Sequence, residues 1–277
     1  MFNLFRHELV SRWRMIFIWG IGLSLWGSIY IAIYPDVAEE MAAFADMQIA
    51  VAMGMDMTTM EGFIASVVIQ ILPLILGIYA IMLGTGTLAG EDDKGTLEMV
   101  VAMPLERWQV VTMKTLALLT LLLLTVIVFA IGESVALAVV SNITEARDVI
   151  TLEPQQLFTA LLGIYPLMVV IFSISLFLGA IMPNRRIALA VMVTIYLASY
   201  VANSAAGLVE SLNWLETISI FSYVNTSGNV FTEGVEMADV AVLLAISVVF
   251  FLLAVVSFQG RNVTVGQWFW QRGQSPA

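Results

Sequence analysis

Six long apolar runs dominate this chain of 277 residues and limit the folds that are open to it. A helix needs about 20 mostly apolar residues to cross a bilayer, and each run is close to that length or longer. The runs are unbroken and lack the alternating ten-residue pattern of an outer-membrane barrel. We therefore expect an all-α integral membrane protein with one transmembrane domain over residues 1–277 and spans at 15–34, 62–89, 111–140, 157–182, 187–209 and 240–258.

Composition agrees with a membrane protein and excludes several kinds of chemistry. Charged residues make up 12% of the chain, whereas soluble domains carry about 25%. The sequence has no cysteine and one histidine, His7, so neither a thiolate nor a multi-histidine metal site is possible within one chain. We expect no enzyme activity, no bound metal or cofactor and no nucleic-acid partner, with the lipid bilayer as the main surrounding.

The basic residues predict how the chain is oriented. An even number of spans places both termini on one side, and ten of the eleven Lys and Arg residues then fall on that side. Short loops rich in Lys and Arg stay in the cytoplasm. We therefore expect a multi-pass cell-membrane protein with both termini in the cytoplasm and only Arg147 outside. The ten inner residues are Arg6, Arg12, Arg14, Lys94, Arg107, Lys114, Arg185, Arg186, Arg261 and Arg272.

Residues 1–14 form an amphipathic pattern before the first span. Phe2, Phe5, Leu9 and Trp13 share one helical face, and basic side chains take other positions. Such a pattern predicts a short helix that lies on the inner surface of the membrane. Two interpretations are open: the helix contacts a cytoplasmic partner, or it is a passive interfacial anchor.

The segment that joins the second and third runs interrupts the apolar pattern in an organised order. Leu97, Val100 and Val101 follow the spacing of one helical face, and Pro104 ends the turn. Glu98 lies in the first turn, where the helix dipole favours a carboxylate. A helix this short is only marginally stable alone. It therefore needs the membrane surface or another protein to pack against.

This segment resembles the cytoplasmic loop of ABC-transporter permeases of the ABC-2 exporter family. The shared order is an acidic residue, Gly-Thr-Leu-Glu, an apolar stretch, a proline, a basic residue and a lysine that opens the next span. The six-span layout, the amphipathic N-terminus and the chain length also agree with that family. The resembling residues are Glu91, Gly95, Thr96, Leu97, Glu98, Pro104, Arg107 and Lys114.

The resemblance implies the permease subunit of an ATP-driven exporter. In that family the loop, here residues 91–110, carries a coupling helix that docks into a separate ABC ATPase subunit, and the ATPase holds ATP and Mg. The family arrangement of two permeases and two ATPases implies a homodimer of this chain. The resemblance also implies that residues 210–239 dip into the membrane from outside as short helices. The apolar spans favour an amphipathic or hydrophobic substrate.

The chain has no nucleotide site of its own. The stretch from Gly90 to Thr96 loosely resembles a phosphate-binding loop, but it has no lysine between Gly95 and Thr96. The alternative function is a stand-alone secondary carrier or channel that ATP does not drive. Such carriers usually have several ionisable residues inside their spans, and this chain has one clear candidate, Glu133. It either faces a substrate cavity or pairs with a polar group of another span.

Prolines and glycines predict local features of the spans. Pro73 and Pro166 lie inside the second and fourth runs and should kink or loosen those helices. A small-residue stretch that includes Gly84, Gly86 and Gly90 lies near the inner end of the second span. It permits either close helix packing or a hinge that passes motion from the cytoplasmic loop.

Overall fold

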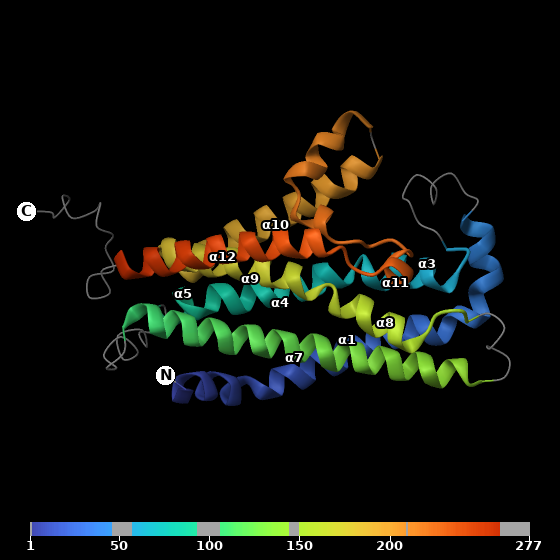
Figure 1. Ribbon diagram of the computed structural model, residues 1–277, viewed down its shortest axis with the longest axis horizontal. Helices are drawn as coiled ribbons and strands as arrows, with labels where there is room; N and C mark the ends of the chain where they lie inside the picture. Colours follow the sequence, from blue (N-terminus) through green and yellow to red (C-terminus); the bar gives the residue numbers. More distant parts are fainter. Residues whose placement is uncertain (1, 46–56, 93–105, 144–149, 209, 261–277) are drawn as a thin grey trace, which may run out of the picture.

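The computed structural model describes residues 2–45, 57–92, 106–143, 150–208 and 210–260 (Figure 1). Within these ranges the chain forms helices and no strands. The predicted all-α fold is confirmed, and each spanning helix overlaps the run that predicted it. The six helices that are long and apolar enough to cross a membrane are Phe2–Met41, Met60–Thr87, Arg107–Ser141, Pro154–Ile181, Arg185–Ala206 and Met237–Gly260.

The first helix, α1 (Phe2–Ala45), runs without a break through the predicted short N-terminal helix. Residues 2–14 are therefore the first turns of α1 rather than a separate element. Leu4 and Glu8 face the bundle, whereas Phe2 is 72% exposed and Trp13 is 50% exposed. Of the predicted apolar face, Phe2 and Trp13 therefore point outward, as an interfacial surface requires, whereas Leu9 packs against the core. Contact of this face with a membrane or a partner stays a prediction.

Helix α7 (Arg107–Ser141) packs against α1 over much of its length, and the two helices run in parallel (Figure 1). Their contacts join residues at an almost constant offset along the chain. Glu8 meets Lys114, Ser24 meets Phe129, and Gly27 meets Glu133. This offset means that the pair keeps one register from one end to the other.

Besides the pair of α1 and α7, the bundle contains a second group of helices that pack around α9 (Tyr165–Ile181). The main helices that pack on it are α4 (Leu72–Thr87) and α12 (Met237–Gly260), and α10 (Arg185–Leu208) lies further out. Figure 1 shows that α1 begins and α12 ends at the same end of the bundle. We call this the inner end, because the described residues near it include most of the basic side chains.

Both predicted prolines interrupt their spans, as expected. The second span consists of α3 (Met60–Ile64), the π-helix η1 (Ala65–Ile69) and α4, which has Pro73 in its first turn. The fourth span consists of α8 (Pro154–Leu162) and α9, which has Pro166 in its first turn. A first-turn N–H has no partner within its own helix, so proline is tolerated where a helix restarts.

The outer segment between α10 and α12 contains short helices, as the resemblance implied. They are η2 (Glu210–Ile218), η3 (Ile220–Tyr223) and α11 (Val230–Glu233). Hydrogen bonds tie the start of η3 to α10: the Ser219 hydroxyl donates to the Ser199 carbonyl (2.9 Å), and the Ile220 N–H donates to the Ser199 hydroxyl (3.1 Å). Entry of this segment into the membrane stays a prediction.

Gly84 allows α4 and α9 to approach each other closely. A Cβ atom at this position would lie 2.6 Å from the Phe172 carbonyl oxygen and 2.5 Å from Ser175 Cβ. Small residues permit such contacts between membrane helices. Close packing is therefore observed at Gly84, while a hinge in the same stretch stays a prediction.

We expect Gly84→Ala to destabilise the protein, because the added methyl group forces the backbone of α9 to move. Overpacking of this kind costs about 1–3 kcal/mol and should lower the melting temperature in detergent. Gly22→Ala on α1 is the matched control, since nothing lies within 4 Å of its Cβ position. A melting temperature for Gly84→Ala equal to that of the wild type would contradict the close contact.

Candidate functional site

Most of the predicted ATPase-contact residues lie outside the described residues. The structure describes the two flanks of the loop at 91–110, which we call the coupling loop. One flank is α5 (Ala89–Asp92), which contains Glu91, and the other is the start of α7 at Arg107. Both flanks lie at the inner end (Figure 1). The coupling helix stays a prediction for Gly95, Thr96, Leu97, Glu98, Val100, Val101 and Pro104.

Helix α7 begins with a well-defined cap at Glu106. The Glu106 N–H donates to Gln109 Oε1 (3.1 Å), and the Glu106 carboxylate accepts from the backbone of Gln109. The indole N–H of Trp108 also donates to this carboxylate. Negative charge at a helix N-terminus is stabilised by the helix dipole. These contacts fix the direction in which the coupling loop enters α7.

Arg107 links the start of α7 to the end of α12. Its Nη1 atom donates to the carbonyls of Phe258 (3.4 Å) and Gln259 (3.3 Å), and its guanidinium lies 6.0 Å from the centre of the Phe258 ring. The last carbonyls of a helix lack partners within the helix, and a cation there is favoured by the dipole. Arg107 thus has a contact within the chain, and its role at an ATPase interface stays a prediction.

Arg185 links the start of α10 to the inner half of α4. Its Nη2 atom donates to the carbonyl of Met82 (3.2 Å). Cβ atoms on Gly86 and Gly90 would each lie 3.3 Å from the Arg185 side chain. Gly86 of α4 and Gly90 of α5 therefore leave room for the Arg185 side chain. The side-chain oxygen of Asn184 accepts from the Ile187 N–H (2.9 Å) and caps α10.

Lys114 links α7 to α1 through a buried ion pair. Its Nζ atom lies 2.7 Å from Glu8 Oε1, and both side chains are more than nine-tenths buried. Arg12, one turn further along α1, lies 3.4 Å from the other oxygen of Glu8. The sequence predicts the inner location of Lys114 but not this pairing. Nothing in the sequence around Glu8 indicated the ion pair, because its partner is 106 positions away.

Glu133 lies between α1 and α7 towards the outer end of the pair. It is 1% exposed, and Oε1 has no hydrogen-bond partner among the described residues. A Cβ atom on Gly27 would lie 2.5 Å from this oxygen. Any residue larger than glycine at position 27 would therefore clash with the carboxyl group in its present position. The structure encloses the predicted polar residue at a helix contact, and Glu133 lines none of the pockets described in this part of the chain.

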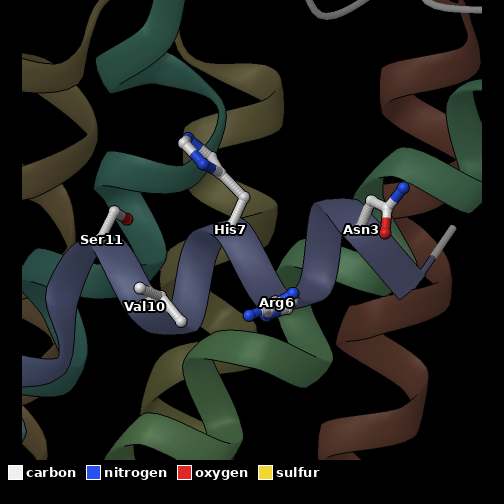
Figure 2. A pocket seen from close by; sticks show the side chains of 5 residues that line it. All are labelled: Asn3, Arg6, His7, Val10 and Ser11. Atoms are coloured by element: carbon white, nitrogen blue, oxygen red, sulfur yellow. The ribbon is translucent and has the colours of Figure 1, made fainter.

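The first turns of α1 border an open pocket of about 460 Å³. Figure 2 shows that the side chains of Asn3, His7 and Ser11 point to the same side of the helix, and Arg6 and Val10 complete the lining. The pocket is therefore bordered by the polar face of α1 rather than by its aromatic face. The pocket lies at the inner end, and the choice between partner contact and passive anchor stays a prediction.

Within the part of the chain that the structure describes, six helices able to span a membrane define a multi-pass helical membrane protein. The family model for ABC-2 family transporter proteins matches residues 2–263. Because this match covers nearly the whole chain, the protein belongs to the ABC-2 transporter family, as the resemblance predicted. It is a membrane permease component of an ABC transporter. No individual curated protein matches the sequence significantly.

We expect the Glu8–Lys114 pair to be cooperative. Glu8→Met leaves Lys114 buried without this carboxylate, and breaking a buried pair from one side costs roughly 3–5 kcal/mol. The double variant Glu8→Met with Lys114→Met buries two apolar side chains instead and should lose much less than the sum of the single losses. Unfolding free energies in detergent, combined in a double-mutant cycle, measure this coupling. Additive losses would show that the pair does not act as a unit.

Proposed function

We propose that this permease forms the membrane path of an ATP-driven exporter and docks a separate ABC ATPase subunit through the coupling loop. The match of residues 2–263 to the ABC-2 family carries the proposal. The position of α5 and Arg107 at the inner end supports it, because both flanks of the coupling loop then face the side where the chain begins. ATP and Mg are held by the partner, since this chain lacks a phosphate-binding loop.

The proposed transporter contains two copies of this chain and two ATPase subunits, and it lies in the cell membrane with both permease termini in the cytoplasm. The basic residues at the inner end support this orientation. The substrate path lies between the two permease copies, and the apolar spans suit an amphipathic or hydrophobic substrate. A stand-alone carrier is the weaker candidate, because the one clear ionisable residue inside the spans, Glu133, is buried against Gly27 at the contact of α7 with α1.

Replacing Leu97 and Val101 with Asp should release the ATPase subunit. Each change places an unpaired charge in the proposed contact, and a buried unpaired charge costs about 3 kcal/mol or more. We expect loss of ATPase co-purification and of export, with normal membrane insertion. Ile143→Asp is the control, because this residue is exposed beyond the outer end of α7. A double variant that keeps its ATPase and full activity would contradict the assignment of the coupling loop.

Cysteine labelling in intact cells tests the orientation without background, because the chain has no cysteine. We expect Lys94→Cys to be protected from an impermeant thiol reagent that is added outside. Glu236→Cys, in an exposed position between α11 and α12, should be labelled. Labelling of the cysteine at position 94 from outside would show that the coupling loop is not cytoplasmic.

A further inference from the structure

A groove of about 220 Å³ lies between α7 and α12, with α9 beneath it. It is open on its outer side, where Leu116, Leu244 and Val248 are exposed. Its deeper part is lined by three buried hydroxyl-bearing residues, one from each helix. They are Thr115 of α7, Ser173 of α9 and Ser247 of α12. The groove is therefore lined mainly by apolar surface, with three hydroxyl-bearing residues beneath it.

The hydroxyl of Thr115 is the unusual group in this groove. The other threonines of α7, at positions 112, 120 and 125, each donate a hydrogen bond to the carbonyl four residues earlier. Thr115 is 5% exposed, and its Oγ1 atom has no partner among the described residues. A buried hydroxyl without a partner costs about 1–3 kcal/mol. A ligand that accepts this hydrogen bond would remove that cost.

The size of the groove indicates a narrow occupant. Pockets for drug-sized molecules usually measure about 300–1,000 Å³, and this groove is smaller. Its walls carry aliphatic side chains and Phe251. Its open side lies on the outer surface of two apolar spans, where we expect the hydrocarbon of the bilayer. A single hydrocarbon chain fits such a space and enters it sideways from the bilayer.

The position of Thr115 along α7 indicates which polar group of a lipid would lie next to the hydrocarbon chain in the groove. Thr115 follows Lys114 directly, and Lys114 is the last basic residue before the long apolar run of α7. Thr115 also lies eight residues beyond Arg107, which is about 12 Å along the helix axis. The ester carbonyls of phospholipids occupy this boundary between head group and hydrocarbon, and they accept hydrogen bonds.

We propose that the groove binds one acyl chain of a phospholipid from the leaflet at the inner end, and that the Thr115 hydroxyl donates a hydrogen bond to its ester carbonyl. The lipid would fill the space between α7 and α12 beyond the contact of Arg107 with Phe258. This site is independent of the proposed docking of an ATPase. It assigns a bound lipid to the peripheral face of the permease.

Native mass spectrometry of the purified chain in detergent tests the hydrogen bond directly. The probe is an equimolar mixture of phosphatidylglycerol with two ester-linked chains and its diether analogue, which lacks the carbonyls. One net hydrogen bond corresponds to a preference of about three- to tenfold, so we expect the ester form to be retained by that factor. Equal retention of the two lipids by the wild type would overturn the proposal.

Thr115→Val removes the hydroxyl and keeps the shape of the side chain. We expect this variant to bind both lipids with a ratio close to one. Thr120→Val is the matched control on the exposed side of the same helix, and it should keep the wild-type ratio. A wild-type preference that survives Thr115→Val would place the lipid elsewhere and overturn the assignment.

The alternative occupant of the groove is a second copy of this chain. Val248 is 56% exposed at the rim of the groove. If a second copy covered the groove, side chains of that copy would contact Val248. Val248→Cys should remain free of disulfide-linked dimer under mild oxidation in native membranes if lipid fills the groove. Rapid dimer formation through position 248 would show that protein, not lipid, covers this face.

Discussion

At the inner end of the bundle, basic side chains between apolar helices are stabilised by partners within the chain. Three basic residues that the sequence explains as markers of orientation each join two helices. Arg107 joins α7 to α12, Lys114 joins α7 to α1, and Arg185 joins α10 to α4. The same charges that favour a cytoplasmic location therefore also hold the spans together.

These links bear on how the proposed transporter would respond to its ATPase. The coupling loop leaves α5 at one end and enters α7 through the Glu106 cap at the other. A displacement of the loop would reach α12 through Arg107 and α1 through Glu8 and Lys114. The parallel pair of α1 and α7 keeps one register over much of its length, so we expect the two helices to move as a unit.

The sequence predicted the features that depend on composition and local geometry. The lengths of the apolar runs gave six spans, and Pro73 and Pro166 marked where two of them break. Contacts between distant segments were not predictable. Glu8 and Lys114 are 106 positions apart, and the neighbour of Glu133 is a glycine without a side chain to signal it. The continuity of α1 was also missed, because charged first turns resemble a separate interfacial helix.

The most direct test of the proposed function is to ask what Leu97 touches in the assembled transporter. A photo-crosslinking amino acid at this position, activated in native membranes, would form a covalent adduct with its nearest neighbour. The account predicts an adduct with an ABC ATPase subunit that carries a phosphate-binding loop, identified by mass spectrometry. Adducts with lipid alone, or with other parts of the permease alone, would contradict it.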